Sequence, residues 1–196
     1  MREVRTRTSA AAVGAALVMT MTACGEDGGG ESTSSSSGTA SSPQTYSEGH
    51  ILAEVKKVDK KLRAVGQGKT IPEDADWATD AFRKPYNDEV KSTKDAGAVV
   101  RGKITTESIR LASNDPDAPG GWDVSTYQCT KSTVRIYIDG KDVTADPEKP
   151  DKLLPKGPRV SAFRKSFTTP DDGKTWQIDD SVRLTGKDEE KARCSE

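Results

Sequence analysis

Residues 122–138, with the sequence WDVSTYQCTKSTVRIYI, decide the fold class that this chain is predicted to adopt. Apolar side chains recur here at every second position, which is the pattern of a strand with one buried face. The stretch divides into two strands, residues 122–130 and 134–138, and the second strand ends at Asp139-Gly140, a strong signal for a hairpin turn. An antiparallel sheet is therefore expected in this half of the chain.

The same alternation extends upstream, where residues 99–111 are predicted to form one long strand. Val100 and Ile104 share one parity in this segment, whereas Ile109 and Leu111 share the other. Because a regular strand cannot keep both pairs on the same face, the sequence predicts a β-bulge between them.

Two further strands are predicted downstream. A Pro-rich connection, residues 149–158, leads to a strand over residues 160–167. The turn Pro170-Asp171-Asp172-Gly173 then leads to the last strand. The apolar residues of this last strand are expected to share one face: Trp176, Ile178, Val182 and Leu184.

The segment before these strands is predicted to be helical. Residues 46–65 carry apolar side chains at helical spacing, with Thr45 and Glu48 as a capping box and Gly66 as a left-handed C-terminal cap. Residues 76–94 form a second amphipathic segment, in which Pro85 predicts a kink or a break into two short helices. Helices followed by strands indicate an α+β fold, with the helices on one face of an antiparallel sheet.

The N-terminus has a basic start, a short apolar run over residues 10–19, and small residues directly before Cys24. This order resembles a bacterial lipoprotein signal, which implies export, cleavage before Cys24 and a lipid on its sulfur. Met21 stands where that motif usually has Leu, and a simple secretory cleavage site is the alternative interpretation. Residues 1–23 are accordingly predicted to be a signal peptide.

The apolar run is too short to cross a bilayer, because a spanning helix needs about 20 consecutive apolar residues. The resemblance therefore implies attachment through acyl chains such as palmitate on Cys24, at the extracellular face of the cell membrane. Residues 24–44 are rich in Gly, Ser and Thr and lack large apolar side chains, so they are predicted to form a flexible tether. Residues 45–196 then form a single α+β domain.

Two cysteines remain besides Cys24. In an oxidising compartment Cys129 and Cys194 are expected to form a disulfide, with free thiols or an intermolecular bridge as the alternatives. No metal site is predicted, because His50 is the sole histidine of the sequence and no further cysteine is present.

The charge balance argues against a nucleic-acid partner. The chain has 30 basic and 31 acidic residues, and removal of residues 1–23, with three Arg and one Glu, leaves 27 and 30, a net charge of −3. Such a mildly acidic surface gives no overall attraction to nucleic acid.

The sequence contains no catalytic motif of the Gly-x-Ser-x-Gly or His-Glu-x-x-His type, and we predict no catalytic residue, metal or cofactor. Residues 66–70, GQGKT, end like a phosphate-binding loop, but they lack its first glycine and follow a predicted helix instead of a strand. Large aromatic side chains are the candidates to line a pocket, with filling of the core as the simpler role: Trp77, Phe82, Tyr86, Trp122, Tyr127 and Trp176.

Several short motifs between residues 45 and 194 recur in one known family. They are Gly102, Tyr127-Gln128-Cys129, Ser132, Asp139-Gly140, Arg159, Arg164 and Gly173-Lys174-Thr175-Trp176. With the helix-then-sheet order, they resemble the nuclear transport factor 2-like, or SnoaL-like, domains of small secreted lipoproteins from actinobacteria. The chain departs from that family in a long charged insertion after Gly140 and at Pro85. The resemblance implies a cone in which helices and a strongly curved sheet enclose a pocket.

Members of that family include isomerases, cyclases and dehydratases as well as binding proteins, so the fold alone does not define the function. We expect a lipid-anchored envelope protein that acts as a non-enzymatic binding or interaction module. Its partners would be membrane lipid through Cys24 and an envelope protein or a small ligand. The alternative is a small-molecule isomerase or cyclase that uses the pocket of the cone, which an unpaired carboxylate or tyrosine in that pocket would favour.

Overall fold

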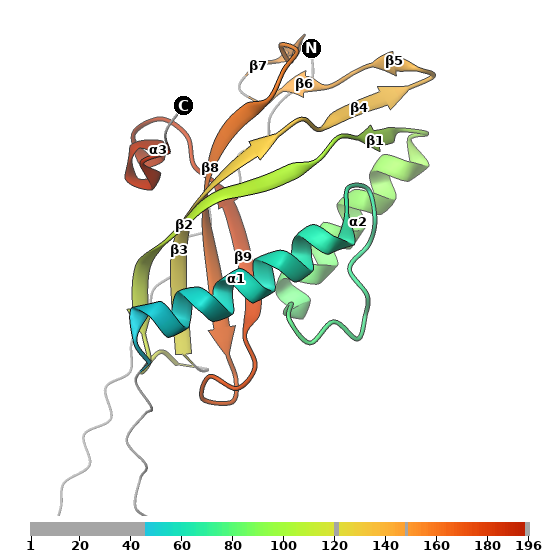
Figure 1. Cartoon of the computed structure of the whole chain (residues 1–196). Helices are drawn as coiled ribbons and strands as arrows, with labels where there is room; N and C mark the ends of the chain where they lie inside the picture. Colours follow the sequence, from blue (N-terminus) through green and yellow to red (C-terminus); the bar gives the residue numbers. More distant parts are fainter. Residues whose placement is uncertain (1–45, 120–121, 148, 195–196) are drawn as a thin grey trace, which may run out of the picture. The chain divides into compact units, whose positions relative to one another are not determined.

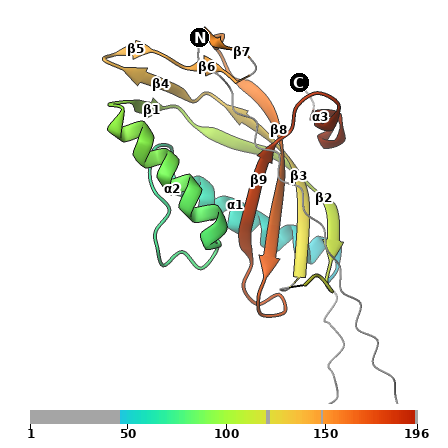
Figure 2. The same cartoon turned by 180° about the vertical axis from the view of Figure 1, so that it is seen from behind.

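The structure of the protein is a computed structural model that describes residues 46–119, 122–147 and 149–194. The predictions for the signal peptide, for lipid attachment at Cys24 and for the tether over residues 24–44 lie outside the described residues. Figures 1 and 2 show the described elements from opposite sides.

The first helix, α1, spans Glu48–Val65, close to the predicted range. Its N-cap is Ser47, whose side-chain oxygen accepts a hydrogen bond from the His50 backbone N–H at 3.3 Å. The prediction of Thr45 as the N-cap was therefore wrong. Gly66 ends the helix with a positive φ of 79°, but its ψ of 166° is not the left-handed helical conformation that was predicted.

The second helix, α2, spans Asp80–Asp95 and runs through Pro85 as one helix, so of the two predicted outcomes at this proline the division into two short helices is wrong. It also begins later than predicted. The Ile178 N–H donates to the Trp77 carbonyl at 2.9 Å, and the Thr79 N–H donates to the Ile178 carbonyl at 3.0 Å. These bonds hold the segment before the helix in an extended conformation against the last strand, where the sequence pattern predicted a helical turn.

Four antiparallel strands form the main sheet in the order β2-β3-β8-β9, and Figure 1 shows that they curve. Their bounds are Ile104–Asp115 for β2, Trp122–Ser132 for β3, Arg159–Thr169 for β8 and Gln177–Arg183 for β9. The pairing of β2 with β3 shifts register between Thr106 and Ser108, which confirms the bulge that the parity change predicted. Helices α1 and α2 both lie on one face of this sheet (Figures 1 and 2), so the α+β class is confirmed.

The remaining strands belong to two smaller sheets. Strand β1 (Val99–Arg101) pairs with β4 (Arg135–Ile138), β4 pairs with β5 (Lys141–Asp142), and β6 (Ala145–Asp146) pairs with β7 (Lys149–Leu153). Asp139 and Gly140 both have positive φ, 50° and 75°, and form the predicted hairpin turn between β4 and β5. Strand β7 lies within the segment that was predicted to be a mere connection.

The predicted long strand over residues 99–111 is divided at Gly102, which has a φ of 103°. A Cβ atom at this position would overlap the backbone carbonyl of Thr133. The division allows β1 to pair with β4 while β2 pairs with β3. Gly102 therefore marks the point where the chain passes from one sheet to the other.

The apolar residues of the last strand do not share one face, contrary to the prediction. Ile178 pairs with Phe167, whereas Asp180 pairs with Ser166, so Asp179 is an extra residue in β9. A bulge reverses the parity of the residues that follow it. Ile178 is accordingly 1% exposed and Val182 is 50% exposed.

The short helix α3, Lys187–Ala192, was not predicted, and it packs on the face of the main sheet opposite α1 and α2 (Figures 1 and 2). Cys129 of β3 and Cys194 form the predicted disulfide. Arg110 also donates to the carbonyls of Lys191 and Ala192, at 2.8 and 2.6 Å. Closing a 65-residue loop contributes about 4 kcal/mol in the chain-entropy model.

The main core lies between the two long helices and the main sheet. Its buried members come from α1, the segment between the helices, β3, β8, β9 and the turn before β9: Ile51, Val55, Val58, Ile71, Trp77, Ala78, Trp122, Val124, Phe167, Trp176 and Ile178. No helix among the described residues is long and apolar enough to span a membrane.

We predict that Gly102→Ala lowers the free energy of unfolding by about 1–3 kcal/mol more than Gly140→Ala. Both glycines have positive φ, which costs an L-residue about 1–2 kcal/mol, but an added Cβ at Gly140 would meet no atom within 4 Å. Urea unfolding followed by tryptophan fluorescence measures both values. Equal losses in the two variants would contradict the claim that the Thr133 carbonyl requires glycine at position 102.

Candidate functional site

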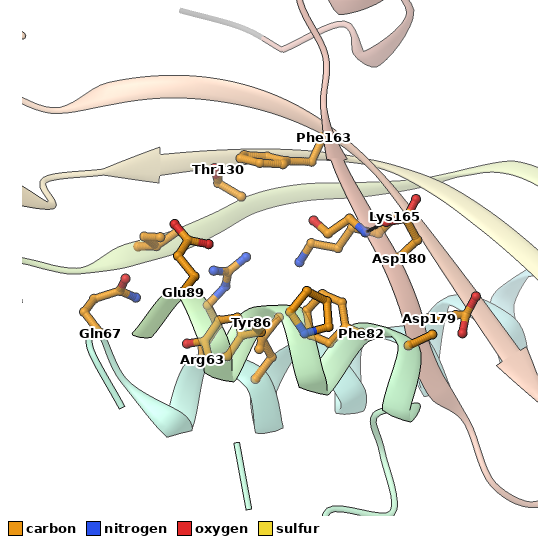
Figure 3. Close-up of a pocket in the computed structure, with 15 residues that line it drawn as sticks. Arg63, Gln67, Phe82, Tyr86, Glu89, Thr130, Phe163, Lys165, Asp179 and Asp180 are labelled. Carbon is orange, nitrogen blue, oxygen red and sulfur yellow. Dashed lines mark hydrogen bonds between the residues drawn. The ribbon is translucent and has the colours of Figure 1, made fainter. Parts of the chain in front are cut away.

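A cleft of about 570 Å³ lies between the two long helices and the main sheet. Figure 3 shows side chains from the helices on one side and from the strands on the other. All four strands of the main sheet contribute to it. The lining residues are Leu62, Arg63, Gln67, Ala81, Phe82, Pro85, Tyr86, Glu89, Ile104, Thr130, Phe163, Lys165, Asp179, Asp180 and Ser181.

A buried ionic network forms the base of the cleft. The Lys165 ammonium group donates to Asp59 Oδ1 at 2.9 Å, and Arg63 Nη2 donates to the same oxygen at 3.4 Å. The Thr106 hydroxyl donates to Asp59 Oδ2 at 2.6 Å and accepts a hydrogen bond from Arg63 Nε at 3.2 Å. Lys165 is 3% exposed and Asp59 is 6% exposed, so the pair that joins α1 to β8 lies away from water, whereas Arg63 and Thr106 are half-buried.

Local structure explains how these side chains meet. Asp59 and Arg63 are four residues apart on α1, so they lie on the same side of the helix. Lys165 occupies the same face of β8 as Phe163 and Phe167, because the three residues alternate along the strand. Thr106 stands at the bulge of β2, directly before the register shift.

The pKa values of the central pair reflect burial and mutual attraction. Burial lowers the pKa of Lys165 from 10.5 to about 8, and repulsion from Arg63 adds to this, while Asp59 opposes it in part. Burial acts to raise the pKa of Asp59, but Lys165, the Thr106 hydroxyl and Arg63 together hold it below its usual value of 3.8. Asp59 is therefore ionised at neutral pH, and the network of two cations and one carboxylate is positive.

Aromatic rings form the apolar walls. The rings of Phe82 and Tyr86 on α2 stack with centroids 6.0 Å apart, and Phe163 of β8 lies on the opposite side (Figure 3). Burial raises the pKa of Tyr86, so its hydroxyl is protonated and can donate a hydrogen bond. That hydroxyl has no hydrogen-bond partner within the part of the chain that the structure describes.

Carboxylates stand at the rim of the cleft. Glu89 and Asp180 are exposed, whereas Asp179 is half-buried and accepts a hydrogen bond from the Thr79 hydroxyl at 2.7 Å. The bulge at Asp179 turns Ser181 into the lining of the cleft. The rim is thus acidic, while the base is positive.

The structure places the six aromatic candidates in three different environments. Tyr86 and Phe82 line the cleft. Trp77, Trp122 and Trp176 belong to the main core, and the Trp122 and Trp176 rings lie 5.8 Å apart. Tyr127 packs beside the disulfide, with the Arg110 guanidinium 5.9 Å from its ring centroid.

The residues at the base of the cleft were missed at the level of sequence. A detectable signal existed in Lys165, which alternates with Phe163 and Phe167 and is therefore a charged residue on an apolar face. Its partner Asp59, 106 positions away in the chain, had no comparable signal. Contacts at that separation depend on the tertiary arrangement of α1 and β8.

A second hollow of about 420 Å³ borders the network at Asp59 and Thr106. It is lined by Lys56, Asp59, Lys60, Thr106, Glu107, Ser108 and Ile109. His50 lies apart from both hollows, exposed in the first turn of α1, where its ring stacks on Tyr46 at 4.4 Å. The described residues contain no cluster of His, Cys, Asp and Glu able to hold a metal ion.

Comparison with known proteins gives little guidance. No protein-family model matches this chain, and no curated protein matches it. Among solved structures, the chain is similar to the intermembrane space region of the chloroplast protein ARC6, with a TM-score of 0.43 and 13% sequence identity. The match covers 73% of this chain and 100% of that chain. A similarity at this level carries no argument about function, which therefore rests on the geometry of the cleft.

We predict that Asp59→Asn lowers the free energy of unfolding by about 3–5 kcal/mol, because Lys165 would remain buried without a counter-charge. Lys165→Met leaves Asp59 bonded to Arg63 and Thr106 and should cost clearly less. Urea unfolding measures both values.

The matched control for this comparison is Lys61→Met, which removes a salt bridge to Asp76 between side chains that are 51% and 72% exposed. It should change stability by less than about 1 kcal/mol. A loss for Lys165→Met as large as that for Asp59→Asn would contradict the assignment of Asp59 as the single counter-ion of two cations.

Proposed function

We propose that this protein is a lipid-anchored cell-envelope protein whose α+β domain binds a small molecule in the cleft between its helices and its main sheet. The observation that supports this proposal is the cleft itself, with apolar walls and a few polar groups converging at its base. Small-molecule sites typically combine a concave apolar surface of about 300–1,000 Å³ with a small number of polar groups that fix the orientation of the ligand.

The position of the cleft also supports membership of the nuclear transport factor 2-like family. That resemblance implied a pocket enclosed by helices and a curved sheet, and the cleft lies between these two layers. We propose the cone-like arrangement on the same grounds.

The proposed location rests on the N-terminal sequence. A basic start, a short apolar run and Cys24 support export and acylation of that cysteine. Two acyl chains give a stable membrane anchor where one chain holds a protein only marginally. Residues 24–44 would then separate the domain from the membrane surface.

Replacement of Cys24 by Ser is predicted to release the protein from the membrane fraction and to change its processing, because no sulfur would remain at this position for lipid attachment. Fractionation of producing cells with intact-mass analysis of the mature protein measures both effects. Cys129→Ser is the control, since it removes a cysteine that takes no part in anchoring. If the Cys24→Ser protein stayed as firmly bound and identically processed, the anchor proposal would fail.

A ligand-detected NMR screen of small amphipathic molecules tests the proposed binding function. Hits should perturb the ring signals of Tyr86 and Phe163 and lose their binding when Ala81, an exposed residue of the cleft lining, is replaced by Trp. Lys84→Trp is the control, because its side chain is 81% exposed on the same helix and does not line the cleft. Binding that survives Ala81→Trp would contradict the proposal.

A second candidate function, a small-molecule isomerase or cyclase, is favoured by two groups that face the cleft. Lys165, with a pKa of about 8, can exchange a proton near neutral pH, and the Tyr86 hydroxyl is free to donate a hydrogen bond within the described structure. The sole carboxylate at the base, Asp59, is fully paired, which favours the binding module. If a compound found in the screen were recovered in a chemically altered form, and if this conversion required Lys165, the result would support the enzyme over the binding module.

A further inference from the structure

The base of the cleft has more positive charge than its own carboxylate can balance. Arg63 and Lys165 both contact one oxygen of Asp59, and neither forms another ion pair among the described residues. An uncompensated charge in a site with little water is unfavourable, so a site of this kind attracts a counter-ion. Solvent cannot supply much of this compensation to Lys165, which is 3% exposed.

Both cations keep hydrogen atoms for such a counter-ion. Arg63 donates through Nε to Thr106 and through Nη2 to Asp59, which leaves its Nη1 group without an acceptor in the described structure. Lys165 donates one of its hydrogens to Asp59 and has no second acceptor there. Both residues line the cleft. Figure 3 shows Arg63 on the helix side and Lys165 on the sheet side of the same space.

We propose that the cleft takes a small molecule with a single carboxylate on a flat apolar body, and that the carboxylate binds between Arg63 and Lys165. This inference rests on the proposed small-molecule binding function and names the class of ligand. Arg63 and Lys165 meet at one oxygen of Asp59 and both line the cleft, so a ligand carboxylate in the cleft can accept a charge-assisted hydrogen bond from each of them.

The rim limits the charge of the ligand. Glu89, Asp179 and Asp180 place carboxylates around the mouth of the cleft, where a second negative group of the ligand would lie. Negative charges repel one another, so a dianion or a phosphate monoester would bind in the cleft more weakly than a monocarboxylate.

The walls define the body of the ligand. Phe82 and Tyr86 present stacked rings from α2, and Phe163 faces them from β8 (Figure 3). Leu62 and Ile104 add to the apolar lining. A flat ring system between these walls would bury apolar surface on both faces, and the Tyr86 hydroxyl could bond a polar substituent on it.

Three probes with one body and different head groups test the proposal: 2-naphthylacetate, 2-naphthylacetamide and 2-naphthylethylamine. Isothermal titration calorimetry and the ring signals of Tyr86 and Phe163 report the affinity and the site. The acid is expected to bind at least about tenfold more tightly than the amide, and the amine more weakly than both, because two charge-assisted hydrogen bonds are lost with the carboxylate.

Variants of the two cations test whether the charge of the site or its shape determines the affinity for the acid. Arg63→Met and Lys165→Met should each weaken binding of the acid by about tenfold or more and leave binding of the amide nearly unchanged. Arg63→Lys keeps the charge and should retain part of the affinity. Lys84→Met, on the exposed side of α2, is the control and should leave all three affinities unchanged.

The outcomes distinguish this inference from the proposed function. If the amide or the amine binds in the cleft as tightly as the acid, the carboxylate assignment fails while small-molecule binding stands. If none of the three probes perturbs Tyr86 or Phe163 at millimolar concentration, the proposed ligand class is contradicted, and the screen of amphipathic molecules alone then decides whether the cleft binds a small molecule. Equal losses of acid and amide binding in Lys165→Met would show a structural effect and would also overturn the assignment.

Discussion

The contact between Lys165 and Asp59 is the interaction on which the arrangement of this domain depends. It joins the middle of α1 to the middle of β8 across the interior, at 2.9 Å, and both side chains are almost fully buried. Buried ion pairs contribute little net stability over apolar residues of the same size, because desolvation offsets the attraction. In this domain the pair would instead favour one position of α1, since a helix that slid along the sheet would leave both charges unpaired. We infer that the pair fixes the position of α1 and thereby the width of the cleft.

Two irregularities in the strands complete the site around this pair. The bulge in β2 lies next to Thr106, whose hydroxyl bonds Asp59, and the bulge at Asp179 in β9 turns Ser181 toward the cleft. Bulges often redirect side chains near functional sites. These two bulges border the cleft, whereas a further register shift of β2, between Leu111 and Ser113, lies beside the main core.

The parts of the fold that depend on local sequence could be predicted. The helical spacing in α1, the Asp139-Gly140 hairpin and the parity change in β2 each depend on residues close together in the chain. The disulfide between Cys129 and Cys194 followed from the small number of cysteines, whereas the short helix α3 before Cys194 did not. The α+β class emerged from the order of these local patterns.

The remaining features depend on partners that a local pattern does not reveal. The segment at Trp77 has helical spacing, yet its backbone pairs with Ile178 of β9 instead. The core tryptophans and the cleft-lining Tyr86 have the same aromatic signature in the sequence, and the fold alone separates them. In the sequence, Asp59 is one of many charged residues of α1. Only the fold shows that Lys165 faces it.

The most direct measurement of this account is the NMR-detected titration of the Lys165 side chain in the full-length protein. Burial beside Arg63 predicts a midpoint at a pKa of about 8 in place of 10.5. It also predicts a lower midpoint in Asp59→Asn, because the attraction of that carboxylate is the main influence that raises it. A midpoint near 10.5, unchanged by the substitution, would show that Lys165 is solvated and unpaired, and the account of the cleft would be contradicted.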